Sequence, residues 1–288
     1  MRSGKLHVLM ACASLLLVSA AIAGPLVLDP EPGVAVPYRF QSTLQGNIIL
    51  PGVGSQPLSL VAEGRYTDKV EQVGPDGERL LSRALRLLQV GESADSLKPD
   101  PSVAQSEPLP YIRDLRGRLL AIGDVAAHEL PPLPLDPVSQ QVDPLFLTFF
   151  QQIVIPYPQG DLAVGMEWDA GPDLRIMKGI TAIQAPSKVV EITTGNPSFA
   201  VIESVVSLMS ESEEQVSIPQ AQGMSLKIRY GAEIKVKQWS AVANGLVART
   251  ESSGKARVDI GMGNGGASAT LNVDTLECLV TYDEEGGQ

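Results

Sequence analysis

Cysteine and histidine are scarce in this sequence, and their scarcity excludes several kinds of site. The chain has two of each, Cys12 and Cys278, and His7 and His128. We expect residues 1–23 to be removed, which leaves one thiol and one imidazole in the mature chain. One thiol cannot form an intrachain disulfide, and a zinc site takes several Cys or His ligands. The sequence therefore predicts no intrachain disulfide and no metal–histidine site.

The two remaining side chains carry little signal for catalysis. Cys278 lies in a strand-like run from Thr275 to Val280. We expect it to be a small buried apolar group, and the alternative is a reactive or intermolecularly bridged thiol. His128 enters a Pro-rich stretch, and no Gly-x-Ser-x-Gly nucleophile elbow occurs in the sequence. We expect an exposed histidine there rather than the base of a catalytic triad.

Basic and aromatic residues are also few. The chain has 22 Lys and Arg against 33 Asp and Glu, a net charge of −11. Nucleic acids and anionic membrane surfaces attract proteins with a basic surplus, so neither is an expected partner. Aromatic residues make up 5% of the chain, which leaves few platforms for sugars. Hydrophobic residues reach 44%, enough for a packed globular core.

The N-terminus has the pattern of a secretory signal peptide. Arg2 and Lys5 precede an apolar stretch from Leu6 to Ile22, and Ala21-Ile22-Ala23 fits a small-x-small cleavage site before Gly24. We therefore expect an exported protein, periplasmic or extracellular. A membrane anchor is the first alternative, but the apolar stretch is marginal in length for a membrane-spanning helix.

A second alternative is a lipoprotein. Leu9-Met10-Ala11-Cys12 resembles the box that precedes a lipid-modified cysteine in bacterial lipoproteins, and it would anchor the protein at Cys12. We prefer cleavage after residue 23, because cleavage before Cys12 would leave the rest of the apolar stretch in the mature protein. No later stretch approaches membrane-spanning length, so no transmembrane segment is expected in the mature chain.

Strict alternation of apolar and polar residues predicts long antiparallel strands. It runs from Tyr38 to Leu50, from Leu58 to Tyr66 and, most clearly, from Met224 to Lys237. Asn244-Gly245 predicts a hairpin turn, and a shift of apolar parity between Val273 and Leu276 predicts a bulge. Further strands are expected over the following ranges: 79–90 (where a helix is the alternative), 189–194 and 199–209.

The middle of the chain has a different composition. Residues 99–158 hold 11 of the 22 prolines, and residues 111–122 suggest two short strands around Arg116-Gly117. One short apolar helix is expected near 144–154, with Asp143 as its cap and Pro144 in its first turn. This helix would pack against the sheet as an apolar plug.

The expected fold class is mainly β (α+β), with long antiparallel meander sheets in two halves. The expected organisation is a signal peptide at 1–23, a Pro-rich leader at 24–37, an N-terminal β-rich half at 38–158 and a C-terminal antiparallel half at 159–288.

Two further motifs do not fit ligand sites. The glycines at 261–266 are followed by strand-like alternation rather than by a helix, so they predict a hairpin and not a dinucleotide loop. The acidic runs at 211–214 and 283–285 lack the spacing of a calcium loop. The sequence therefore assigns no catalytic, cofactor-binding or metal-binding residue.

One region is similar to a group of known proteins. Arg116-Gly117-Arg118-Leu119, the expected helix, Pro156 and Pro158, and then Val164-Gly165-Met166-Glu167-Trp168 occur in this order. The order resembles uncharacterised exported bacterial β-rich proteins that carry a central Val-Gly-x-x-Trp element. Met166 departs from the acidic or small residue usual there. The resemblance implies a location in the cell envelope and supplies no activity. Physically, Gly165 suits a tight turn and Trp168 a core anchor.

Three functions remain compatible with these observations. The expected one is a non-catalytic binding or structural protein of the cell envelope with an unknown protein partner. The alternative is a periplasmic carrier of an apolar or lipid-like small molecule, by analogy of fold alone. A hydrolase that uses only carboxylates is the weakest candidate, because no pair can be chosen from 33 acidic residues.

Overall fold

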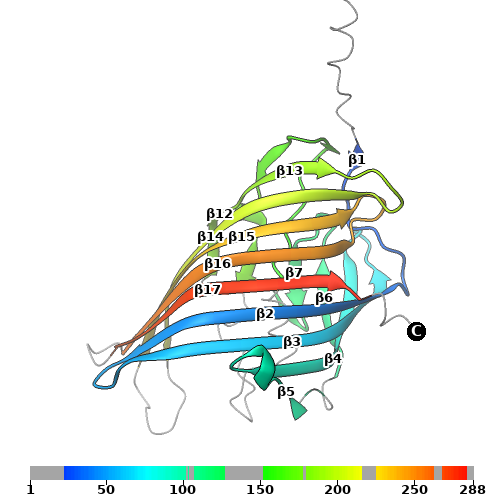
Figure 1. Cartoon of the computed structure of the whole chain (residues 1–288). Coiled ribbons are helices and arrows are strands. Elements are labelled where there is room, and N and C mark those ends of the chain that lie inside the picture. Colours follow the sequence, from blue (N-terminus) through cyan, green and yellow to red (C-terminus); the bar gives the residue numbers. More distant parts are fainter. Residues whose placement is uncertain are drawn as a thin grey trace, which may run out of the picture.

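The computed structural model describes residues 23–101, 103, 107–126, 152–177, 180–215, 225–262 and 268–283. Antiparallel strands dominate these residues, and 15 of the strands form one sheet. Long curved strands make up its centre, and the short strands β6 and β7 lie behind them (Figure 1). The expectation of a mainly β, antiparallel fold is confirmed.

The C-terminal strands pair in chain order, as a meander does. They are β13 (Pro186–Ile192), β14 (Phe199–Gln215), β15 (Ser225–Ala241), β16 (Val247–Met262) and β17 (Ser268–Tyr282). Asn244-Gly245 lies in the turn between β15 and β16, with Gly245 at φ +67°. The pairing register shifts between Val273 and Thr275, so the predicted bulge is confirmed.

The N-terminal strands form a second meander in the same sheet. Its elements are β2 (Ala35–Leu50), β3 (Gly54–Val73), β4 (Arg79–Gly91), β6 (Leu109–Arg113), β7 (Leu119–Ile122) and β8 (Val125–Ala126), with β5 (Lys98–Pro99) beside β4. The segment that fitted a strand or a helix is therefore a strand, β4. The two short strands expected around Arg116-Gly117 are β6 and β7.

Shorter elements complete the described chain. β10 (Glu167–Asp169) pairs with β13, and β12 (Ile180–Gln184) pairs with β14 and with β11 (Arg175–Met177). β1 (Ala23–Pro25) and β9 (Asp161–Leu162) form a separate two-stranded sheet. Short 3-10 turns occur as well, including Ala94–Ser96 and Gly171–Asp173.

The two meanders are continuous with each other. β17 pairs with β2 from Thr270–Ile49 to Tyr282–Tyr38, so the last strand in chain order lies beside the first long one. The two expected halves thus contribute strands to a single sheet.

Several sequence expectations fall outside the described residues: the signal segment 1–22 with Cys12, His128, and residues 144–151 of the expected helix. Gln152, Ile153 and Val154, which were expected to end that helix, are described and are not helical. The next residue explains why. Ile155 N–H donates to Gln238 Oε1 at 2.8 Å, and Gln238 Nε2 donates to Ile155 O at 3.3 Å. The backbone N–H and C=O of Ile155 thus bond to the Gln238 side chain of β15 and not to helical partners along the chain.

The sheet has two distinct faces. The inner face carries the buried apolar side chains, and the outer face carries charged ones. Leu26, Leu28, Ile155, Tyr157 and Leu162 pack in the same core cluster as inner-face residues of β14 and β15. The leader therefore contributes two leucines to the core, which its Pro-rich composition did not predict. Among the residues placed by the structure, no helix is long and apolar enough to span a membrane.

Candidate functional site

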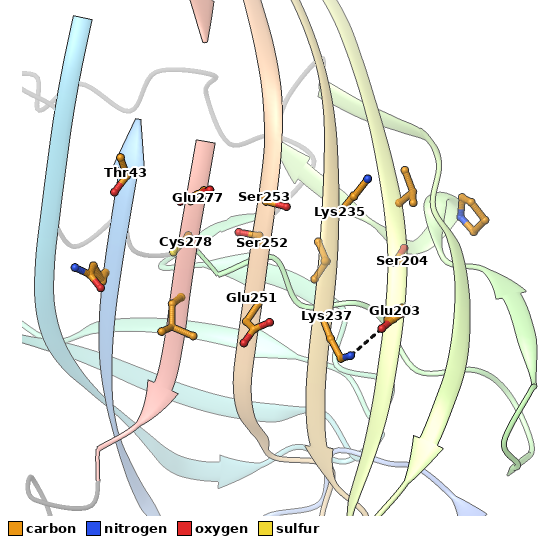
Figure 2. Close-up of a pocket in the computed structure, with 15 residues that line it drawn as sticks. Thr43, Glu203, Ser204, Lys235, Lys237, Glu251, Ser252, Ser253, Glu277 and Cys278 are labelled. Atoms are coloured by element: carbon orange, nitrogen blue, oxygen red, sulfur yellow. Dashed lines mark ion pairs between the residues drawn. The ribbon is translucent and has the colours of Figure 1, made fainter. Parts of the chain in front are cut away.

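The outer face is hollowed by a groove of about 820 Å³, which we call the outer groove. It crosses β14, β15, β16, β17 and β2, and Figure 2 shows its side chains standing on these strands. Its charged residues are two lysines and three glutamates: Lys235, Lys237, Glu203, Glu251 and Glu277. They share one face because they occupy alternate positions along their strands.

The pairing register sets the order of side chains across the groove. Lys235 of β15 lies opposite Ser253 of β16, and Ser253 lies opposite Glu277 of β17, which in turn faces Thr43 of β2. Neighbouring strands lie about 4.8 Å apart. Two strand spacings therefore separate the Cα atoms of Lys235 and Glu277 by about 10 Å. The side chain of Ser253 stands between theirs (Figure 2).

Only part of the charge in the outer groove is paired internally. Lys237 Nζ lies 2.8 Å from Glu203 Oε1, and this hydrogen bond raises the pKa of Lys237. Lys235 and Glu277 make no ion pair with any residue that the structure describes. The groove thus presents one ammonium and one carboxylate to an approaching partner.

Cys278 lies next to the groove but its side chain belongs to the core. It is buried in the cluster that contains Tyr38, Phe40 and Tyr66. Burial raises the pKa of its thiol to about 12, so the thiol stays protonated and unreactive near neutral pH. The expectation of a small buried apolar group is confirmed, and no disulfide involves the described part of the chain.

A second cluster of polar groups is buried inside the sheet, and we call it the arginine cluster: Arg83, Asp68, Gln152, Tyr66 and Tyr111. Arg83 is 1% exposed. Its Nε and Nη2 each donate to the Asp68 carboxylate at 2.7 Å. The Arg83 guanidinium also lies over the ring of Tyr66, 4.1 Å from its centroid. The pair has the bidentate geometry that makes arginine–carboxylate bonds strong.

Gln152 joins the arginine cluster from the chain segment before Ile155. Its Oε1 accepts from Tyr66 Oη–H at 2.8 Å and from Arg83 Nη2 at 3.2 Å. Burial raises the pKa of Tyr66 and of Tyr111, and the nearby Asp68 carboxylate raises both further. Both phenols therefore remain neutral, which suits hydrogen bonding rather than proton transfer near pH 7.

The Val-Gly-x-x-Trp region is structural in its described contacts. Gly165 has φ +86°, as its expected turn requires. Trp168 is partly buried against the core, and its Nε1–H donates to Pro156 O at 3.1 Å. In the Arg116-Gly117 segment, Asp114 accepts from the backbone N–H of Arg116 and of Arg118, both at 2.9 Å, and holds the turn around Gly117.

Comparisons with known proteins leave the family open. The sequence matches the model of no protein family, and no curated protein matches it. Among solved structures, the chain is similar to DynF from the dynemicin biosynthesis pathway of Micromonospora chersina, at 8% identity. That match covers 94% of this chain and 90% of DynF, with a TM-score of 0.24. A TM-score this low carries no argument about fold or function.

Proposed function

We propose that this protein is a non-catalytic binding protein of the cell envelope, and that its outer groove holds a polypeptide segment with charges of both signs. The observation that carries the proposal is the arrangement of Lys235, Ser253 and Glu277 across three strands. The location in the envelope rests on the signal pattern of residues 1–23 and stays part of the proposal.

The size and openness of the groove favour a macromolecular partner. Its volume of about 820 Å³ is within the range of small-molecule sites, but such sites bury most of the surface of their ligand. Here Glu203, Lys235, Ser253 and Glu277 are exposed. An open surface that carries both signs of charge matches the rim of a protein interface, where complementary charges select the partner and its orientation.

Site-specific photo-cross-linking in intact cells tests this proposal. A benzoylphenylalanine at Ser253 should give one discrete adduct, whereas the same probe at exposed Gln72 of β3, outside the groove, should not. Lys235→Glu should reduce the Ser253 adduct by about tenfold or more, because a reversed charge faces a like charge of the partner. Lys255→Glu, the same change on the same face beyond the groove, is the matched control. Equal loss in both variants, or identical adducts from Ser253 and Gln72, would refute the proposal.

A second candidate function, carriage of an apolar ligand, is favoured by a different surface. At the end of the sheet that holds the β2–β3 turn, the inner face carries an apolar stripe: Leu44, Ile48, Leu60, Val258 and Leu271. All five belong to one face by register, since Leu44 pairs with Leu60, and Leu271 pairs with both Ile48 and Val258. Leu60 is 41% exposed and the other four are half-buried.

Native mass spectrometry of protein purified from its own envelope, followed by organic extraction, tests the carrier function. A co-purifying lipid that is lost in Leu60→Glu would support it. A ligand-free mass for the native protein would count against it and leave the outer groove as the functional surface.

A further inference from the structure

The hairpin of β2 and β3 lacks charged side chains over the half that holds its turn. Residues 40–62 contain no Asp, Glu, Lys, Arg or His, although Asp, Glu, Lys and Arg make up 19% of the whole chain. β17 pairs with this half of β2, and the sequence 260–273 is uncharged as well. The turn lies at the far end of the long strands (Figure 1). One end of the sheet is therefore free of charge over three neighbouring strands.

The end of this hairpin is also apolar and exposed, and we call Ile49, Leu50 and Val53 the apolar tip. Their exposed fractions are 42%, 38% and 64%. Val53 is the most exposed large hydrophobic residue of the described chain. Single exposed hydrophobic residues are ordinary, but a group of them at one turn marks a contact surface.

The apolar tip has no polar side. By register Ile49 lies on the outer face, in the same row as Arg229 and Asp259, whereas Leu50 and Ile48 lie on the inner face. A protein partner usually packs against one face, and its interface has a polar rim. A tip that is apolar on both faces and at its turn is fully covered when it enters an apolar medium end-on. A lipid bilayer offers such a medium.

The backbone limits how deeply the tip enters. β2 is paired on both sides, with β3 up to Leu50–Gly54 and with β17 up to Ile49–Thr270. β3 pairs with β4 only from Val61 onward, so no described strand covers the other edge of residues 54–60. Unpaired backbone N–H and C=O groups are too costly in hydrocarbon. The geometry therefore allows the turn to reach the headgroup boundary and no deeper.

Charge decides which bilayer surface fits. The chain has a net charge of −11, and the tip supplies no Lys or Arg to attract anionic lipids. We propose that the apolar tip docks the protein onto a zwitterionic lipid bilayer, with Val53 at the boundary between headgroups and acyl chains. This surface lies apart from the outer groove and does not depend on the function proposed for that groove.

Fluorescence quenching at one position tests the docking. Ile49→Trp places an indole on the tip of the full chain, and brominated phosphatidylcholine quenches tryptophans that contact lipid. Quenching should exceed that of the unmodified chain, in which Trp168 and Trp239 give the background. Bromine near the headgroup end of the acyl chain should quench more than bromine near its methyl end. Because the reporter is local, binding of lipid by residues 1–23 does not imitate this result.

Val73→Trp is the matched control for position. Val73 is 44% exposed and ends β3, on the order of 60 Å along the strand from the tip. The turn that follows it carries Asp76 and Glu78. Its tryptophan should not be quenched beyond the background.

A charge at the turn should remove the contact. Added to Ile49→Trp, Val53→Asp should raise the lipid concentration at half-quenching by about tenfold or more, because the burial of one valine is lost. Val73→Asp, the same change at the other end of β3, should leave it unaltered. Both valines are exposed, so far-UV circular dichroism and the urea midpoint should not change.

The same measurements define what would overturn the proposal. Equal quenching in Ile49→Trp and Val73→Trp would show that the tip does not contact lipid. Quenching that disappears at high salt, or that strengthens when phosphatidylglycerol is added, would show electrostatic adsorption instead. A blue shift of the Ile49→Trp emission with protein concentration in the absence of lipid, abolished by Val53→Asp, would assign the tip to contact between two copies of the chain.

Discussion

Arg83 is the buried side chain on which the local order of β3 and β4 depends most directly. It forms two bonds to Asp68, one to Gln152 and a ring contact with Tyr66. The apolar parity of β4 places Arg83 between Leu81 and Leu85 on the inner face. Such an arginine specifies its surroundings, because each of its neighbours loses a partner if it is removed.

We expect Arg83→Met to lower the free energy of unfolding by about 3–5 kcal/mol, since it leaves the Asp68 carboxylate buried without its cation. Urea denaturation followed by far-UV circular dichroism measures the change. Arg257→Met, which breaks an exposed pair with Asp259, serves as the control and should hardly alter the transition. A loss of equal size in both variants would contradict the role given to Arg83.

Two buried groups predict how stability responds to alkaline pH. Burial raises the pKa of Cys278 to about 12 from an ordinary value of 9, and that of Tyr157 to about 12 from 10. The unfolded chain therefore releases these protons first, and stability falls as the pH rises from about 9 to 12. Below pH 9 their contribution is fully present. The cysteine accounts for up to about 4 kcal/mol of the fall.

Chemical denaturation at a series of pH values measures this slope, and Cys278→Ala should make it shallower. At pH 8.5 the native thiol should react with a disulfide reagent far more slowly than the urea-unfolded chain. Reaction at the same rate in both states would show that the thiol is accessible.

The turn between β15 and β16 is the element whose sequence and geometry agree most closely. Gly245 has φ +67°, and a Cβ at this position would lie 2.2 Å from the carbonyl oxygen of Val27. The same turn accepts a hydrogen bond from Asp29 N–H at Asn244 O, 2.8 Å long. The hairpin turn therefore also positions the leader.

Gly245→Ala should cost more than about 2 kcal/mol of stability, because it combines a left-handed backbone with a steric clash. Gly52, at φ +75° with no atom within 4 Å of where a Cβ would lie, is the matched control. Gly52→Ala should cost only the conformational part, about 1 kcal/mol. Thermal or urea unfolding compares the two variants. Equal losses of stability would mean that the segment around Val27 moves away from the added methyl group at little cost.

Alternation along the chain predicted the long strands, because a half-buried strand has one apolar and one polar face. Its own sequence therefore shows the pattern without knowledge of its neighbours. The hairpin at Asn244-Gly245 and the bulge after Val273 were predictable for the same reason. The pairing of β17 with β2 was not, because it joins residues as far apart as Arg39 and Thr281. The sequence pattern of either strand does not indicate which strand it pairs with.

The candidate sites were hidden for two different reasons. Lys235 was recognisable as a polar position of an alternating strand, but its relation to Glu277 across Ser253 depends on the strand order. Arg83 carried a usable signal, a charge in the apolar parity of β4. Gln152 did not, because its segment was expected to be the end of a helix and instead crosses the sheet.

At the scale of the whole molecule, the single sheet predicts one cooperative unfolding event. The β17–β2 ladder removes any boundary between the two meanders. Each meander without the other would leave one of these two strands unpaired, so we expect them to unfold together. Fluorescence of Trp168 and Trp239, both in the C-terminal part, should report the same urea midpoint as far-UV circular dichroism of the whole chain. Two separated midpoints would show that the meanders unfold independently.

The place of β17 also constrains the order of events during synthesis. Its partner β2 emerges from the ribosome early, yet the ladder between Arg39 and Thr281 spans 242 positions and forms only after β17 has appeared. Until then β2 and β16 each expose an unpaired edge to other chains. Such high contact order slows folding, so the nascent polypeptide has a long interval in which a holdase chaperone would protect it from aggregation.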